Sequence, residues 1–461
     1  MKNKVRVYAV LAGLVIILLT WSQSFFINYV IPLGVAAIAV SLVNGWVIKK
    51  HSEKKVQRML IGLTTLFLVV EILWMLIDHI VLFVIAQSTF ALIGLTLLGL
   101  GLGIQANKKR NFPSVIAGIG KWVFLLGLLL ITSSLLLFTV TPKPVTLYLQ
   151  STTGAKNTYQ AEPSTTTIVD DKYQLISNIQ YGEKYPRSFL YIITPSGQFD
   201  EKRPTYFYVH GGGFIFGDAM GGDPNAGSAQ NLALYQYEKM IDQGYNVVTI
   251  NYAYAPQYVH PTPIKQLSEA VEFMQKNGAQ YGINMQDVVF AGGSAGGHIA
   301  AEFTTIQANR GYAEEIGIDP IIELENIKAV VLESAPFDAT RGHKTVKEDV
   351  VIDYTFGQSL GAYFDLPVVS ADKEKLEQLN LIPKATNNFP PTFISDGNTG
   401  TFADQAEDYY NRLKELGVKT DLYIPDIKEG AEGHGFMVQN IESKAAKTYL
   451  DRKFDFLESL D

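Results

Sequence analysis

The sequence contains no cysteine among its 461 residues, which excludes disulfide bonds and thiol chemistry. Acidic residues are scarce in the first 140 positions, where 3 Asp and Glu stand against 12 Lys and Arg, a balance of +9. Residues 141–461 carry the remaining 42 acidic and 26 basic side chains, a balance of −16. Because this acidic part has no basic patch, we expect no nucleic-acid partner.

Long polar stretches are missing from residues 1–140, and this region is almost wholly apolar. Five of its segments approach the roughly 20 residues that cross a bilayer core. We therefore expect transmembrane helices at 5–21, 26–48, 59–77, 79–104 and 118–140. A cleaved signal peptide would also explain the first segment, because Lys2, Lys4 and Arg6 precede it, but no small-residue cleavage site is evident.

Basic residues lie on one side of these apolar segments. They occur near the N-terminus, in residues 49–58 and in residues 108–110, whereas the connections at 22–25 and 78–79 have no Lys or Arg. Cytoplasmic loops are enriched in Lys and Arg, so five spans would make this a multi-pass protein of the cell membrane, with residue 141 onward on the extracellular side. A four-span arrangement would place that part of the chain inside.

Glycine is concentrated around one serine in the acidic region. The stretch Ala-Gly-Gly-Ser-Ala-Gly-Gly at 291–297 follows an apolar strand candidate at 287–290 and precedes a helix-like run at 298–310. In that context the pattern G-x-S-x-G predicts a nucleophile elbow, a tight strand-to-helix turn that exposes the serine. Gly292 and Gly296 supply the missing side-chain bulk, and Ser294 is the predicted nucleophile.

A second glycine run lies upstream, as His-Gly-Gly-Gly-Phe at 210–214, directly after a strand candidate at 205–209. Backbone amides that point at a developing oxyanion lower the barrier of acyl transfer. We predict that Gly211 and Gly212 donate such amides, with Gly213 in the same turn and Ala295 as the third donor. A phosphate-binding loop would need a Lys-Ser or Lys-Thr directly after the glycines, and none follows this run.

The predicted general base is His434, which lies in a Gly-flanked loop after the last strand candidate. A serine hydroxyl becomes nucleophilic when a neighbouring base accepts its proton, and an imidazole suits that role near neutral pH. An acid should then orient the histidine. Asp404, at the start of a helix, is favoured over Asp396, at the end of a strand, and Asp338 is a third candidate.

These motifs together resemble the hormone-sensitive-lipase-like carboxylesterases and acetyl esterases (bacterial family IV) of the α/β-hydrolase fold. The segments that carry the resemblance are His-Gly-Gly-Gly-Phe at 210–214, Asn-Tyr-Ala-Tyr-Ala-Pro at 251–256, Gly-Gly-Ser-Ala-Gly-Gly at 292–297 and Gly-His-Gly-Phe at 433–436. The resemblance implies ester hydrolysis without a metal or organic cofactor. It spans roughly residues 170–461.

The chain departs from the family pattern at several positions. Asn251 and Ala253 replace an acid and an arginine, and Gly293 stands where many relatives carry an acidic residue. The family's acid would fall at Gly400, which has no side chain, so the acid must come from another position. This is why both Asp404 and Asp396 are kept as candidates.

Strand and helix candidates alternate through residues 171–461, which predicts an α/β fold with a mostly parallel sheet of eight strands covered by helices on both faces. The expected strands are 173–180, 188–194, 204–209, 246–252, 287–292, 328–334, 391–396 and 420–424. Residues 1–140 form the all-α transmembrane region, and residues 141–170 are interpreted as a tether. Segments 217–237 and 341–381 are expected to roof the site.

The resulting hypothesis is a membrane-anchored serine carboxylesterase that acts on short-chain acyl esters, either small molecules or envelope glycans. One alternative is an acyltransferase or deacetylase that acts on cell-envelope glycans with the same machinery. Others are a peptidase and a non-catalytic binding module, although such modules typically lose the histidine. The lipid bilayer is an expected partner of the apolar segments, and the sequence leaves the oligomeric state open.

Overall fold

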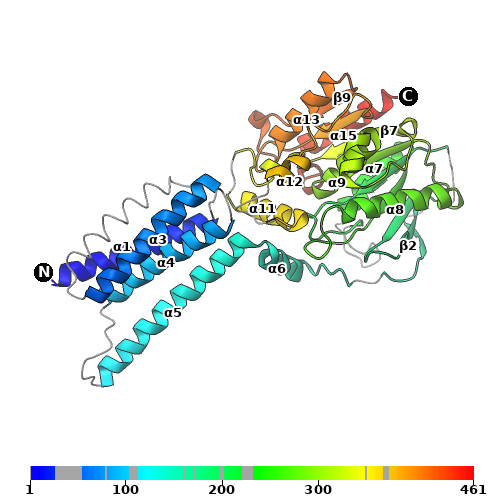
Figure 1. The fold of residues 1–461 in the computed structure, drawn as a ribbon. Coiled ribbons are helices and arrows are strands. Elements are labelled where there is room, and N and C mark those ends of the chain that lie inside the picture. The colour runs from blue at the N-terminus through cyan, green and yellow to red at the C-terminus, as the bar shows by residue number, and fades with distance from the viewer. Residues whose placement is uncertain are drawn as a thin grey trace. The chain divides into compact units, whose positions relative to one another are not determined.

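The computed structural model resolves the chain into two compact units, and each is described by itself. The first comprises Met1–Pro144 with Leu366–Ala371, and the second comprises Val145–Asp365 with Asp372–Asp461. The described residues are 2–25, 54–77, 80–102, 112–158, 161–169, 172–196, 202–220, 232–347, 350–366 and 373–461. The ribbon of the whole chain is drawn in Figure 1.

The described part of the first unit is helical. Its helices are α1 (Lys2–Phe25), α3 (Lys54–Ile77), α4 (Ile80–Gly101) and α5 (Phe112–Val140). Phe67 of α3 stacks on Phe90 of α4 with ring centroids 4.8 Å apart, within a buried cluster that also contains Ile16 of α1. The indole N–H of Trp21 donates to the Thr132 hydroxyl at 2.8 Å and thereby ties α1 to α5.

The expected membrane helices are only partly supported. Four of the five expected segments fall on α1, α3, α4 and α5, and 26–48 lies outside the described residues. Among the described residues, one helical stretch, Gly118–Leu137, is long and apolar enough to cross a bilayer by length and composition. The apolar stretches of the other three helices, Arg6–Trp21, Gln57–Val70 and Ile85–Gly101, are shorter. A multi-span membrane region is therefore not shown.

The second unit is built on a nine-stranded sheet with the order β1-β2-β3-β5-β4-β6-β7-β8-β9. The strands β3 to β1 form an antiparallel edge, and β5, β4 and β6 to β9 run parallel. Their bounds are β1 (Thr166–Val169), β2 (Tyr173–Gln180), β3 (Phe189–Pro195), β4 (Thr205–Val209), β5 (Asn246–Ile250), β6 (Val288–Gly293), β7 (Ile327–Glu333), β8 (Thr392–Ser395) and β9 (Thr420–Tyr423).

All eight expected strands are present, and β1 is an addition. The expected tether at 141–170 needs correction, because it contains β1 and the helix α6 (Lys143–Thr153). Strand β1 is held by pairing with β2, where Thr166 lies opposite Ile176. A four-residue strand at a sheet edge carries a weak sequence signal, since its partner supplies the hydrogen bonds and half of its side chains face solvent.

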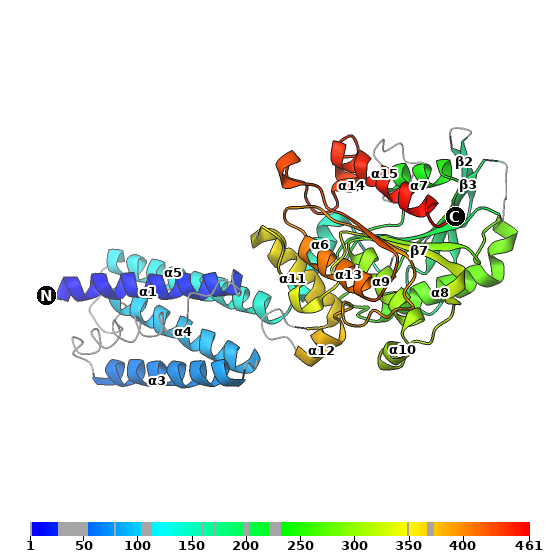
Figure 2. The same cartoon turned by 90° about the horizontal axis from the view of Figure 1, so that it is seen from above.

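Helices cover both faces of the sheet. Figure 2 shows α7, α14 and α15 on one face and α8, α9 and α13 on the other. The helix bounds are α7 (Leu232–Asp242), α8 (Thr262–Asn277), α9 (Ala295–Ala308), α10 (Arg310–Ile316), α11 (Val350–Phe364), α12 (Lys373–Gln378), α13 (Ala403–Glu415), α14 (Phe436–Gln439) and α15 (Lys444–Glu458), with short 3-10 turns at Gly278–Tyr281, Leu324–Asn326, Ala339–Arg341 and Ile427–Glu429.

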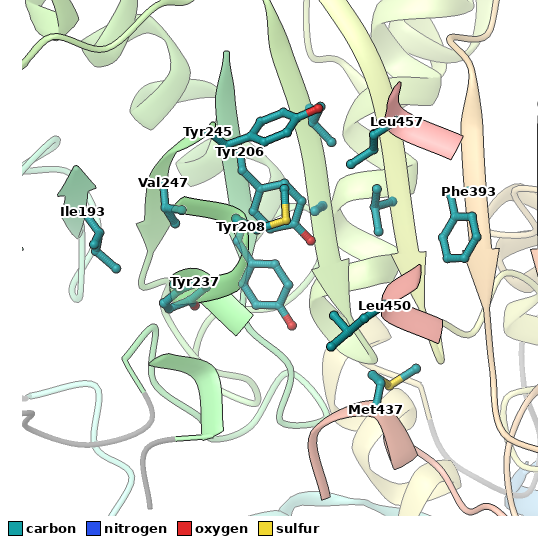
Figure 3. Close-up of a cluster of buried hydrophobic side chains, with 14 of the residues drawn as sticks. Ile193, Tyr206, Tyr208, Tyr237, Tyr245, Val247, Phe393, Met437, Leu450 and Leu457 are labelled. Atoms are coloured by element: carbon teal, nitrogen blue, oxygen red, sulfur yellow. The ribbon is translucent and has the colours of Figure 1, made fainter. Parts of the chain in front are cut away.

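Alternating side chains of the strands build the two cores. In β4, Tyr206 and Tyr208 point to the face covered by α7 and α15, where Tyr237 and Leu450 are also buried (Figure 3). Phe207, between them, points to the opposite face and packs 5.6 Å from Phe290, measured between ring centroids. Each fully buried side chain of this size stabilises the fold by about 1.5–3 kcal/mol. These cores fix the carboxyl ends of β4, β6 and β8, where the predicted site residues follow.

Candidate active site

The predicted nucleophile lies at a strained turn between β6 and α9. Ser294 has φ +53° and ψ −119°, a region that non-glycine residues rarely adopt. Its amide donates to the Glu333 carbonyl of β7 at 2.7 Å. Side chains at Gly292 or Gly296 would collide with backbone, because a Cβ on Gly296 would meet the Val209 carbonyl. The glycines therefore allow the close approach that the turn requires, as expected for an elbow.

His434 lies within hydrogen-bonding distance of this serine. Its Nε2 is 2.8 Å from Ser294 Oγ, although 140 residues separate the two in sequence. Burial lowers the pKa of His434 to about 4, so the imidazole is neutral at pH 7 and its Nε2 can accept the serine proton. The rings of Phe356 and Phe402 pack against it, with centroids 4.8 and 5.7 Å away.

The glycine run after β4 lies beside the serine. A Cβ added to Gly211 would stand 3.3 Å from Ser294 Cβ, and Gly212 and Gly213 have φ of +111° and +57°. Within the described residues, the amides of Gly211, Gly212, Gly213 and Ala295 donate no hydrogen bond. Unengaged donors next to the nucleophile are what an oxyanion hole requires.

His210 opens this run and has a structural role. Its ring stacks on Tyr252 with centroids 4.3 Å apart, and the Tyr252 hydroxyl donates to the His210 carbonyl at 2.9 Å. Burial lowers the pKa of His210 to about 3, so the ring is neutral at pH 7. Its Nδ1 lies 2.6 Å from the Gly211 carbonyl and holds that peptide in place.

The preference for Asp404 as the acid is corrected by its contacts. Arg341 donates to Asp404 at 3.0 Å, to Asp338 at 2.7 Å and to Asp408 at 2.7 Å, so the guanidinium engages all three carboxylates. None of them hydrogen-bonds to His434 in the described part of the chain. Asp404 lies in the first turn of α13, where the positive end of the helix dipole also stabilises a carboxylate.

Asp396 lies closer to the histidine and is fully buried after β8. Within the described residues, no hydrogen bond joins it to His434. The Thr401 hydroxyl donates to Asp396 Oδ1 and lies 3.2 Å from His434 Nδ1. Burial raises the pKa of Asp396 to about 6, although the Thr401 hydroxyl and the Gly397 amide favour its charged form. The structure thus brings Ser294, His434, Thr401 and Asp396 into one hydrogen-bonded chain.

The geometry agrees with the comparison to known proteins. A family model described as an alpha/beta hydrolase fold matches residues 206–438, just over half of the chain. The chain belongs to this family. An esterase of Gibberella moniliformis is 24% identical over 253 residues, which cover 55% of this chain and 73% of that enzyme. An acetyl esterase of Salmonella typhi is 31% identical over 120 residues, which cover 26% of this chain and 32% of that enzyme.

A solved structure also has the same fold. The crystal structure of esterase B from Lactobacillus rhamnosis gives a TM-score of 0.52 at 21% sequence identity and covers 69% of this chain and 95% of that one. With its family membership and esterase relatives, this alpha/beta hydrolase is a carboxylic ester hydrolase.

One of the two expected roof segments brings aromatic rings to the site of the hydrolase. Most of 217–237 lies outside the described residues, whereas 341–381 contains α11 and α12. Phe356 of α11 is the ring that packs on His434. Tyr363, near the C-terminal end of α11, instead stacks on Phe214 with centroids 3.8 Å apart. The insertion therefore contributes both to the surroundings of the base and to a separate packed cluster.

That cluster surrounds a buried carboxylate on the elbow helix. Glu302 Oε1 lies 2.7 Å from His260 Nε2 and accepts from the Tyr312 hydroxyl at 3.1 Å, and Oε2 lies 3.3 Å from His298 Nε2. Although burial raises its pKa, the two histidines hold the pKa of Glu302 well below its usual range. The other ring nitrogen of His298, Nδ1, lies 2.8 Å from the Pro336 carbonyl, so this histidine ties α9 to the segment after β7.

Two side chains that support loops near the site were not predicted from the sequence. Gln150 of α6 is buried and donates to the carbonyls of Ile215 and Ala255, both at 2.8 Å, so it supports the loop that continues from the glycine run. Arg187 donates to Asn251 at 3.2 Å and lies over the Tyr254 ring at 4.3 Å. A guanidinium from another segment therefore lies beside Asn251, in the same loop where Ala253 replaces the family arginine. Neither residue sits in a motif, so no sequence signal identified them.

Proposed function

We propose that the chain is a membrane-anchored serine carboxylesterase that hydrolyses short-chain acyl esters, with Ser294 as the nucleophile and His434 as the general base. The observation that carries this proposal is the 2.8 Å distance between Ser294 Oγ and His434 Nε2. A neutral, buried imidazole at that distance is the arrangement that converts a serine hydroxyl into a nucleophile.

The reaction proceeds in two steps, acylation of Ser294 and hydrolysis of the acyl-serine. Ser294 Oγ attacks the ester carbonyl while its proton passes to His434 Nε2, and the amides of Gly211, Gly212 and Ala295 stabilise the oxyanion. The imidazolium then gives that proton to the departing alcohol, which leaves an acyl-serine. Water repeats the same proton transfers, releases the carboxylic acid and restores the serine. Asp396 stabilises the imidazolium in both halves.

The short-chain preference is supported by two observations. The Salmonella typhi relative is named an acetyl esterase, although the match covers only 26% of this chain. The rings of Phe356 and Phe402 lie against His434, so bulky groups occupy space beside the reacting atoms. Small esters fit this environment better than long acyl chains. Acetylated envelope glycans belong to the same chemical class, and the proposed extracellular placement gives access to them.

The membrane anchor rests on the first unit. The stretch Gly118–Leu137 of α5 has the length and apolar composition of a span, and its mean hydropathy is 1.9. The basic residues at 49–58 and 108–110 lie in the connections that the positive-inside rule assigns to the cytoplasm. With five spans, the hydrolase unit lies outside the cell.

The test is hydrolysis of p-nitrophenyl esters from acetate to decanoate by the 461-residue chain and its Ser294→Ala variant. Serine-dependent turnover that is fastest with the short esters is expected. Residual activity of Ser294→Ala within about tenfold of wild type would remove Ser294 as nucleophile, because such a loss is normally several orders of magnitude. Product analysis with an added sugar alcohol separates hydrolysis from acyl transfer.

A further inference from the structure

The imidazole of His434 is separated from Asp396 by a threonine hydroxyl. Thr401 is fully buried, its Oγ1 lies 3.2 Å from His434 Nδ1, and it donates to Asp396 Oδ1. In the described part of the chain, no carboxylate hydrogen-bonds to His434. The atom that contacts Nδ1 of the base therefore belongs to a neutral side chain.

The donors and acceptors of this chain allow one arrangement of protons when Asp396 is ionised. A carboxylate only accepts, so the single hydroxyl proton of Thr401 points to Asp396. The lone pairs of Thr401 Oγ1 then accept the Nδ1–H of His434. That tautomer leaves Nε2 without a proton, facing the Ser294 hydroxyl. Each hydrogen bond thus fixes the direction of the next one.

The backbone holds the threonine in position from two sides. The amide of Val346 donates to the Thr401 carbonyl, and the amide of Gly400 donates to the Val346 carbonyl, both at 2.9 Å. The amides of Asn398 and Thr399 donate to the Glu432 carbonyl, two residues before His434. Gly400 has φ +61°, which allows the chain to turn between these two attachments. The hydroxyl is therefore preorganised toward the imidazole.

We propose that Thr401 is a positioning residue that links Asp396 to His434, so that the catalytic chain of this esterase has four members. The inference rests on the proposed function of Ser294 and His434. When Ser294 attacks, its proton moves to Nε2, the Nδ1–H remains on the ring, and the Thr401 proton remains on Oγ1. The Thr401 hydroxyl dipole and the Asp396 charge together stabilise the imidazolium, and no proton has to leave the threonine.

The first test compares three variants of the 461-residue chain. Thr401→Val keeps the shape but removes the hydroxyl, and should lower kcat by about 100-fold while KM stays within about threefold, because the loss falls on the transition state. Thr401→Ser restores the hydroxyl and should keep kcat within about fivefold of wild type. Thr392→Val is the matched control, since Thr392 is also buried but donates to the Pro390 carbonyl at 2.8 Å.

The second test is a double-mutant cycle with Asp396→Asn. If Thr401 and Asp396 act as one unit, the double variant should have a kcat within about threefold of the slower single variant. Multiplicative effects of the two substitutions would show that they act separately and would overturn the link. A Thr401→Val enzyme with kcat within about threefold of wild type would overturn it as well.

A readout that does not depend on turnover separates this inference from the proposed function. Reaction of Ser294 with a fluorophosphonate probe tests the nucleophile, and its absence would count against the proposed function alone. The Nδ1–H resonance of His434 in ¹⁵N-histidine-labelled protein tests the link. It should shift or broaden in Thr401→Val and remain near its wild-type position in Thr401→Ser. An unchanged resonance in Thr401→Val would overturn the role of Thr401 whether or not any ester is hydrolysed.

Discussion

Burial sets opposite protonation states on the two titratable members of the hydrogen-bonded chain. It lowers the pKa of His434 to about 4 and raises the pKa of Asp396 to about 6, because in each case it disfavours the charged form. At pH 7 His434 is therefore neutral and Asp396 is charged. Those are the two states that general-base catalysis by a histidine requires.

A pH profile of kcat/KM should show the titration of Asp396 and of His434 as separate steps. As the pH falls through about 6, Asp396 takes up a proton and loses the charge that stabilises the imidazolium, so activity should fall before His434 itself is protonated. In Asp396→Asn the step near pH 6 should be missing and the rate should be low throughout. Stopped-flow or plate assays across that range measure it. A wild-type profile that is flat down to about pH 5 would contradict the assignment.

The two candidate acids should respond very differently to amidation. Asp396→Asn should lower kcat by about 100-fold or more, because the charge behind the histidine is lost. Asp404→Asn should leave kcat within about threefold of wild type. It should lower the free energy of unfolding by less than about 1 kcal/mol, since its partner Arg341 is partly exposed and keeps two other carboxylates. Equal rates for wild type and Asp396→Asn would require the acid to lie elsewhere.

The proximity of Ser294 and His434 was predictable from sequence, and the contacts of the three candidate acids were not. Ser294 and His434 stand in glycine-rich motifs whose spacing reflects the backbone geometry that the chemistry needs. Asp396, Asp404 and Asp338 stand in no comparable motif, and their contacts depend on where one arginine and one threonine lie. Arg341 and Thr401 reach them across 63 and 5 positions of sequence, so no local pattern distinguishes the three carboxylates.

At the scale of elements, α6 should matter for catalysis although it carries no catalytic residue. Gln150→Ala removes the donor of two carbonyls in the loop beside the glycine run. Unsatisfied buried acceptors cost about 1–3 kcal/mol, so the unfolding midpoint and kcat should both fall. Ser151→Ala, one position later and exposed, is the matched control. Unchanged values for Gln150→Ala would mean that the loop does not depend on α6.

Helix α11 should influence which acyl chains are accepted. Phe356→Ala removes the ring that packs 4.8 Å from His434, so it should open space beside the reacting atoms and move the preferred p-nitrophenyl ester to a longer chain. The partly exposed Thr355 on the same helix provides the control Thr355→Ala. An unchanged preference in Phe356→Ala would show that the acyl group binds on another side of His434.

The pattern of apolar and polar residues predicted most strands and helices, because the apolar residues are the ones that become buried. The eight strands from β2 to β9 read as apolar runs bounded by turns, and each pairs with strands on both sides except β9. Strand β1 and helix α6 lie in the threonine-rich segment 141–170. They form because β2 and the carbonyls of Ile215 and Ala255 offer hydrogen-bonding partners, which is information that a local pattern does not contain.

At the scale of the whole molecule, the N-terminal apolar region and the hydrolase region carry net charges of opposite sign. Residues 1–140 carry a balance of +9 and residues 141–461 one of −16. An acidic hydrolase unit would be repelled by an anionic bilayer surface. The proposed attachment to a membrane would therefore come from the apolar helices of the first unit.

That attachment and its direction can be measured on intact cells. The 461-residue chain should stay in the membrane fraction after alkaline carbonate extraction, whereas a version that starts at residue 143 should be released. With five spans, a membrane-impermeant amine reagent should modify lysines of the hydrolase unit, such as the exposed Lys276 and Lys444, without permeabilisation. Labelling only after permeabilisation would place the unit inside and support four spans. Release of the whole chain by carbonate would remove the membrane anchor and leave the esterase chemistry of Ser294 unaffected.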